Sequence, residues 1–475
     1  MVLLNFVKSE SNNNIPLDDL SIDPLTRDKP ILTGTADATR KKVIQKIPLI
    51  IRRIQSGNPD LLHYSVQDIR KILSDRDPLI DLIIQHGLVQ ILHGLILTDT
   101  RDDTKFEAIW GLTNILSMYL VYIYTNLLII LKKKVGTNEQ CRYVVDHGVV
   151  PTLIELLASP VDSLREQSCW AISNVVGDTP ALRDYVLNLN LTDHLLNTLN
   201  AQNLPVAILK NLSWLLSNCI RGNPPPQYHH IEPFIPAICK LIMNTDQIES
   251  NTDIINDALW ALLHFTDNDT FVKLSKNLIC QYDLISTLIK YLFDKTFSKV
   301  SIRILGNLLS GEDDIVDIII GCGFLEHFPE YLRSANGVFV KDCVWSLSNI
   351  TKTVIKSGIL QDLLKLWPTF TRNDVKLEIS WVIVNSVGGA SHLQTQELIK
   401  MDIIRSLYNI LELMKVATLK PTSVLPYHYL ESVNRLLKIG ERLAMQDQSS
   451  DPAVPLAGNG REGSTKKKSI FRYVF

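Results

Sequence analysis

A tryptophan followed by an asparagine one helical turn later recurs along the chain and constrains the fold more than any other feature. Five of the seven tryptophans carry an asparagine four residues on. These pairs are Trp110–Asn114, Trp170–Asn174, Trp214–Asn218, Trp345–Asn349 and Trp381–Asn385. Related segments around Trp260 and Arg303 continue the series, and between Trp170 and Trp345 neighbouring marks are 42 to 46 residues apart. This period is typical of repeat proteins whose units contain two or three helices.

The composition agrees with an all-α array of such units. The chain has 475 residues, which is too long for one ordinary compact core. Its apolar fraction is 46%, yet alternating strand patterns are sparse, whereas leucine and isoleucine recur at helical spacing. Gly87, Gly148 and Gly323 stand about where one unit passes to the next, and glycine permits a sharp bend between helices.

The limits of helical periodicity divide the chain into three parts. Residues 1–42 lack it and are expected to be poorly ordered, residues 43–445 form the predicted solenoid, and residues 446–475 are predicted to be a flexible basic tail. Residues 118–134 are an apparent insertion, because removing them restores the normal period between Trp110 and Trp170. The uncharged run 108–131 is long enough to span a membrane, but it begins inside a Trp–Asn unit, so we predict no membrane segment.

Charge, cysteine usage and motifs exclude several classes of function. The formal net charge is −2, which leaves no excess of Lys and Arg for binding nucleic acid. The seven cysteines are widely spaced and form no C-x-x-C pair, as expected for reduced thiols of a protein of the cytoplasm or nucleus. Phosphate-binding, nucleophile and zinc motifs are missing, so we predict no enzyme, no cofactor and no metal site.

Stacked units would align the Trp–Asn pairs into a ladder that suits an extended basic peptide, because residues four apart share one face of a helix. Asparagine amides can donate to and accept from a peptide backbone without reading its sequence. Parallel tryptophan rings form slots for lysine side chains. A tryptophan at helical spacing is more often simply core, but asparagines without partners would be costly in a core. We therefore favour ligand binding.

Carboxylates at the ends of the slots would complete such a site, because a half-buried ammonium group needs a nearby opposite charge. Asp178, eight residues after Trp170, is the first candidate. The further candidates are Asp257, Asp267, Asp313, Glu107 and Glu378.

Six segments, taken in order, resemble the importin alpha family of nuclear import adaptors across residues 43–445. They are SDRDPLIDLIIQHGLV, REQSCWAISNVVGD, SWLLSNCIRGNPPP, IRILGNLLSGED, CVWSLSNIT and LLKIGE. The resemblance implies a right-handed superhelical solenoid of about ten armadillo repeats, with a concave groove that binds lysine-rich nuclear localisation signals of cargo proteins. It also implies an importin-beta carrier as a partner and allows an export receptor.

The resemblance implies two peptide sites in this groove. The major site would comprise Trp110, Asn114, Gly136, Gln167, Trp170, Asn174, Asp178, Trp214, Asn218 and Asp257. The minor site would comprise Arg303, Asn307, Trp345, Asn349, Glu378, Trp381 and Asn385. Three features depart from the family: His264 stands where the family has an aromatic residue, the first 40 residues lack the clearly basic segment that binds the carrier, and residues 118–134 are inserted. A catenin-like armadillo scaffold is the alternative, but its groove would be basic and take acidic peptides.

Overall fold

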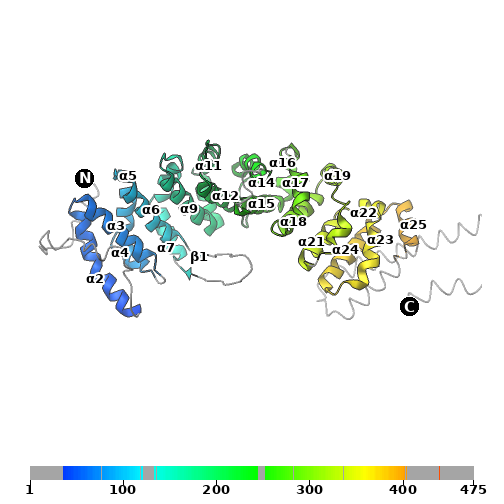
Figure 1. Cartoon of the computed structure of the whole chain (residues 1–475), viewed down its shortest axis with the longest axis horizontal. Helices are drawn as coiled ribbons and strands as arrows, with labels where there is room; N and C mark the ends of the chain where they lie inside the picture. The colour runs from blue at the N-terminus through cyan, green and yellow to red at the C-terminus, as the bar shows by residue number, and fades with distance from the viewer. Residues whose placement is uncertain are drawn as a thin grey trace, which may run out of the picture. The chain divides into compact units, whose positions relative to one another are not determined.

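The structure is a computed structural model of the chain (Figure 1). It describes residues 36–75, 78–117, 119–120, 133–134, 136–243, 252–281, 283–334, 336–401, 403 and 438. Apart from one short pair of strands, the elements of these residues are helices. The chain divides into two compact units, residues 1–265 and residues 266–475, which we describe in turn.

The N-terminal unit contains the elements from α2 to α15. They are α2 (Ala36–Gln55), α3 (Pro59–Leu73), α4 (Ile80–Gln85), α5 (Leu88–Thr98), α6 (Asp102–Leu116), β1 (Tyr119–Leu120), β2 (Lys133–Lys134), α7 (Asn138–Asp146), α8 (Val149–Glu155), η3 (Leu156–Ala158), α9 (Asp162–Asp178), α10 (Pro180–Leu187), α11 (Leu191–Leu199), α12 (Val206–Ile220), α13 (Tyr228–Ile231), η4 (Glu232–Phe234), α14 (Ile235–Met243) and α15 (Thr252–Thr266).

The C-terminal unit contains the elements from α16 to α25. They are α16 (Asp269–Gln281), α17 (Leu284–Tyr291), α18 (Ser298–Leu309), α19 (Asp313–Gly321), α20 (Phe328–Tyr331), α21 (Gly337–Ser348), α22 (Thr351–Ser357), α23 (Ile359–Leu366), η5 (Trp367–Thr369), α24 (Asn373–Gly389) and α25 (His392–Lys400).

Each repeat has one long helix that carries a Trp–Asn pair or the corresponding residues, and successive long helices pack on one another. In the N-terminal unit α3 packs against α6, α6 against α9 and α9 against α12, and in the C-terminal unit α18 packs against α21 and α21 against α24. The shorter helices α5 and α8 pack on α6 and α9, respectively. Helical spacing places Cys169, Ile172 and Val176 of α9 in the core. The predicted all-α solenoid of armadillo-type repeats is confirmed.

The bends between short helices fall where the glycine pattern predicted them. Gly87 lies between α4 and α5 with φ of 65°, and Gly148 lies between α7 and α8 with φ of 76°. These are left-handed conformations, which glycine adopts without the steric cost that a side chain would add. Thr137 then starts α7 with a capping box in which it exchanges hydrogen bonds with Gln140.

The two ends of the predicted insertion lie together. Tyr119 of β1 pairs with Lys134 of β2 in an antiparallel ladder, and the Gly136 amide donates to the Ser117 carbonyl at 3.1 Å. The chain therefore leaves the repeat at 117 and re-enters it at 136, while α6 and α9 still pack together. Residues 121–132 lie outside the described residues. Among the helices described, none has both the length and the apolar character needed to cross a membrane.

The RGNPPP segment is held by a buried arginine. Arg183 of α10 is 1% exposed, and its guanidinium donates to the carbonyls of Arg221 at 2.8 Å and Pro224 at 3.0 Å. It also pairs with Asp184 at 2.8 Å. Because a buried guanidinium needs such partners, Arg183 ties the loop after α12 to the body of the unit.

The described cysteines are free thiols, as the sequence predicts. The six cysteines whose side chains are described are free, and all but Cys322 are buried. Burial raises the pKa of the Cys141 and Cys239 thiols to about 12, which keeps them protonated.

Helix α2 begins at residue 36, before the predicted boundary at residue 43, because its apolar spacing is preceded by a polar first turn. The predicted boundary at residue 445 and the basic tail lie outside the described residues.

Candidate peptide-binding site

The predicted asparagines of the N-terminal unit each reach back to the preceding repeat. The Nδ2 atom of Asn114 donates to Ser74 Oγ at 2.9 Å, that of Asn174 donates to Ser117 Oγ at 2.6 Å, and that of Asn218 donates to the carbonyl of Ser173 at 3.0 Å. Such a bond fixes the amide and leaves its oxygen and second N–H as bonding groups. Asn114 and Asn174 are half-buried, whereas Asn218 is only 2% exposed and offers little to a ligand.

The asparagines of the C-terminal unit also donate hydrogen bonds to the preceding repeat. Asn307 Nδ2 donates to Asp267 Oδ1 at 2.8 Å, Asn349 Nδ2 to the carbonyl of Gly306 at 3.0 Å, and Asn385 Nδ2 to the carbonyl of Ser348 at 3.2 Å. Asn349 and Asn385 are exposed. Their amides are therefore both oriented and open to solvent.

The tryptophans of the ladder are partly exposed rather than enclosed in the core. The rings of Trp110, Trp170, Trp214, Trp345 and Trp381 are half-buried. Trp260 is 42% exposed and lies beside His264, with ring centroids 5.8 Å apart. A ring anchored on one side and open on the other can pack against a long aliphatic side chain with a cationic tip.

Asp178 at the end of α9 has a carboxylate without a hydrogen-bond partner among the described residues. Both of its oxygens are buried, and neither accepts a hydrogen bond within the part of the chain that the structure describes. Burial raises the pKa of Asp178, and its charge adds to the burial that raises the pKa of Cys141, so the two side chains are close. An unpartnered buried carboxylate is costly and is the type of group that a ligand cation would satisfy.

Gly136 and Gln167 have structural contacts in the same region. A Cβ on Gly136 would overlap the carbonyl oxygen of Ile115, so only glycine fits there. Gln167 is buried, and its Nε2 donates to Thr113 Oγ1 at 2.9 Å, which joins α9 to α6. Gly136 thus packs against the end of α6, and Gln167 joins the two helices that carry Trp110 and Trp170.

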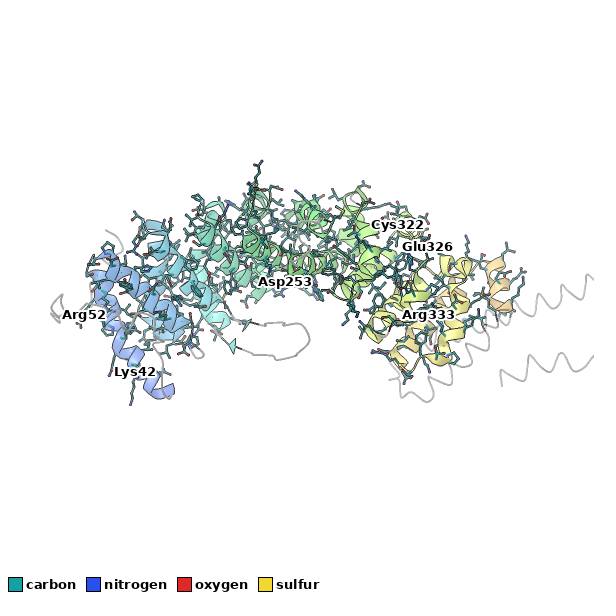
Figure 2. The ribbon with its side chains drawn as sticks, in the orientation of Figure 1. Lys42, Arg52, Asp253, Cys322, Glu326 and Arg333 are labelled. Carbon is teal, nitrogen blue, oxygen red and sulfur yellow. The ribbon has the colours of Figure 1, made fainter. Side chains whose placement is uncertain are left out.

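Asp257 on α15 is a second half-buried carboxylate. It accepts a hydrogen bond from Ser213 Oγ of α12 at 3.1 Å, which links the repeats of Trp214 and Trp260. Burial, with a smaller contribution from the charge of Asp253, raises the pKa of Asp257 to about 7. Asp253, labelled in Figure 2, is exposed and lies 3.5 Å from the Lys210 ammonium. Asp257 is therefore the carboxylate of this pair that is shielded from water.

The C-terminal unit places its own cations beside its acids. Glu378 of α24 is half-buried, with Lys341 Nζ 3.9 Å from Oε1. Asp342 is 8% exposed; burial raises its pKa, while the charges of Arg303 and Lys341 oppose that shift. Arg303 itself is exposed on α18. The predicted Glu378 and Arg303 thus belong to one charged cluster.

Sequence reasoning missed Asp342, Lys341 and the role of Arg70. Asp342 could have been found, because it stands three residues before Trp345, as Glu107 stands before Trp110 and Glu378 before Trp381. Glu107, by contrast, is paired internally: Arg70 Nε donates to its Oε2 at 2.7 Å, so it is not a free carboxylate for a ligand.

Comparisons with known proteins agree with the repeat fold. The Armadillo/beta-catenin-like repeat model matches residues 137–177, which span α7, α8 and nearly all of α9. An engineered protein of known crystal structure superimposes with a TM-score of 0.63 over 85% of this chain and 94% of its own, at 19% identity. This likeness bears on the fold alone.

Curated relatives carry the family assignment. Importin subunit alpha-2 of Arabidopsis thaliana is 34% identical over 49% of this chain and 39% of its own length. Importin subunit alpha-1a of Oryza sativa subsp. japonica is 30% identical over 72% of this chain and 61% of its own. The chain thus spans less than two thirds of these two relatives. Importin subunit alpha-4 of Arabidopsis thaliana is 30% identical over 86% of this chain and 71% of its own length. The chain belongs to the importin alpha family.

Proposed function

We propose that the chain is a nuclear import adaptor that binds lysine-rich nuclear localisation signals of cargo proteins along its Trp–Asn ladder. The observation that carries this proposal is the carboxylate of Asp178, both of whose oxygens are buried and have no partner among the described residues. A lysine ammonium would supply the missing charge and hydrogen bonds there. Asn114 and Asn174, which are held by the preceding repeats, would bind the peptide backbone.

The main lysine pocket is proposed at Asp178, with Asp257 as the acid of a neighbouring pocket. Trp110, Trp170, Trp214 and Trp260 would flank the lysine side chains. Gly136 and Gln167 shape the wall, and the buried Asn218 supports it by bonding to Ser173. In this major site the carboxylate of Asp178, which has no partner among the described residues, would attract a cation, which favours a basic ligand over an acidic one.

A minor site is proposed in the C-terminal unit, along Arg303, Asn307, Trp345, Asn349, Glu378, Trp381 and Asn385. Asn349 and Asn385 of this site are exposed, and both are oriented by the preceding repeat as in the major site. Its acids already lie near Lys341 and Arg303, so they would attract a ligand lysine less strongly. We expect weaker binding at the minor site than at the major site.

The proposal extends to an importin-beta carrier, which the chain would link to its cargo, and to an export receptor that would return it. The adaptor would then move between cytoplasm and nucleus. Arg40, Lys41 and Lys42 at the exposed start of α2 are the described basic residues nearest the segment that would contact the carrier. Retention of the chain on an immobilised importin-beta carrier tests this link, and no retention above that of an unrelated protein would contradict it.

Fluorescence polarisation with a labelled lysine-rich peptide at physiological salt tests cargo binding. We expect the intact chain to bind and Asp178→Lys to lose at least about tenfold in affinity, since one repelling charge replaces one attracting charge. Asp193→Lys is the matched control, because it makes the same charge change at an exposed position of α11 and should bind as the wild type does. Binding of acidic peptides instead would support the scaffold alternative and contradict the adaptor.

A further inference from the structure

Arg70 stands at the tryptophan position of the ladder in the repeat before Trp110. A shift of 40 residues relates Arg70 to Trp110, and the same shift relates Ser74 to Asn114. Arg70 and Ser74 are four residues apart, as Trp110 and Asn114 are. The repeat that contains α3 therefore presents arginine and serine where the next repeat presents tryptophan and asparagine.

The Arg70 guanidinium covers one face of the Trp110 ring. Its Cζ lies 4.3 Å from the ring centroid, and its Nε donates to Glu107 Oε2 at 2.7 Å. Gln67 Nε2 donates to the other oxygen of Glu107 at 3.1 Å. The side chains of Arg70 and Glu107 are only 17% and 10% exposed, so the stack is firmly held. The Arg70 guanidinium thus covers the ring face of Trp110 and binds the carboxylate of Glu107, the two groups that a ligand lysine would use.

From this geometry we infer that Arg70 closes the ladder at its N-terminal end and sets where the lysine run of a bound peptide must stop. This inference rests on the proposed function. The first slot that can take a ligand lysine is the one between Trp110 and Trp170. A lysine beyond Trp110 would meet a positive charge on the ring, and Glu107 is already paired with Arg70, so the site does not favour lysine at that peptide position.

The same register in the C-terminal unit also holds an arginine, but its side chain lies in a different environment. Arg303 also stands four residues before an asparagine of the ladder, Asn307. It is exposed, whereas Arg70 is half-buried and pinned by Glu107. Asp342 stands three residues before Trp345, as Glu107 stands before Trp110. What distinguishes Arg70 is therefore its hydrogen bond to Glu107, which holds the guanidinium on the ring.

Peptides of graded length test the closure. A labelled run of alternating lysine and alanine is lengthened by one lysine at a time at either end and titrated by fluorescence polarisation. We expect the wild-type affinity to stop rising at one end, while Arg70→Ala gains about threefold or more from the next lysine at that end. Arg142→Ala, which removes an exposed ion pair on α7, should follow the wild type. Equal gains in wild type and Arg70→Ala would overturn the inference.

A second measurement needs no peptide. Removing the guanidinium uncovers one face of Trp110, so caesium ions should quench more of the tryptophan fluorescence in Arg70→Ala than in the wild type. The increase should vanish in the double variant Arg70→Ala/Trp110→Phe. Arg70→Gln, which keeps a donor for Glu107, serves the same comparison if the alanine variant does not fold. No increase in quenching would overturn the closure, whereas an increase with no binding of any peptide would contradict the proposed function and leave the closed slot standing.

Discussion

Asp178 and Asp257 differ in the hydrogen bonds that their carboxylates accept. Asp178 has two buried oxygens without partners among the described residues, whereas Asp257 accepts a hydrogen bond from Ser213. In both, burial is the main cause of a raised pKa. Groups that lower stability in this way are often retained because a ligand uses them. Asp178 is therefore the stronger candidate for direct contact with a lysine.

The pKa of Asp257 makes stability depend on pH near neutrality. Because its folded pKa is about 7, above the ordinary value of about 3.9, the stability that its protonation provides is present in acid and is lost as pH rises through about 7. We expect the stability advantage of Asp257→Asn over the wild type, measured by urea unfolding, to grow from pH 5 to pH 7 and then level off. Asp193→Asn should show no such trend, and a pH-independent difference for Asp257→Asn would contradict the assignment.

At the scale of the helices, close packing between long helices sets the position of each ring. Gly306 of α18 faces Trp345 of α21, and a Cβ there would lie 2.8 Å from the ring atom Cε3 and overlap Cζ3. The carbonyl of Gly306 also accepts from Asn349. Gly306 thus contacts both Trp345 and Asn349: its missing side chain leaves room for the ring, and its carbonyl binds the amide.

Substituting Gly306 tests this seating. We expect Gly306→Ala to lower the free energy of unfolding by about 1–3 kcal/mol, because the new methyl group must displace the ring, and to weaken peptide binding at the minor site. The matched control is Gly321→Ala in α19, where a Cβ meets nothing within 4 Å and helix propensity predicts a gain of up to about 1 kcal/mol. Equal stability of the two variants, measured by thermal unfolding, would show that Trp345 does not rest on Gly306.

At the scale of the whole molecule, the repeat period was enough to predict the solenoid, the long helices and the glycine bends. The i to i+4 spacing also identified the residues that share a helix face, which is a local property. It could not identify what lies opposite that face: Arg70 on Trp110, Lys341 beside Glu378 and the burial of Asn218 all depend on packing between repeats. The same limit applies to Glu107, which the sequence predicts as an acid for a ligand lysine although Arg70 neutralises it.

The net charge is only −2, but the two units differ in whether their buried acids have cationic neighbours. In the N-terminal unit Asp178 is unpaired among the described residues, while in the C-terminal unit Lys341 and Arg303 lie near Asp342 and Glu378. We therefore place most of the affinity for a basic peptide in the N-terminal unit.

A charge-swap experiment tests the central claim most directly. The affinity of a lysine-rich peptide, and of variants with each lysine in turn replaced by glutamate, is measured on the wild type and on Asp178→Lys. The account predicts that one glutamate peptide, and no other, binds Asp178→Lys at least about tenfold more tightly than it binds the wild type, because the reversed ion pair re-forms. If no glutamate peptide binds Asp178→Lys better than the wild type, Asp178 does not hold a ligand lysine.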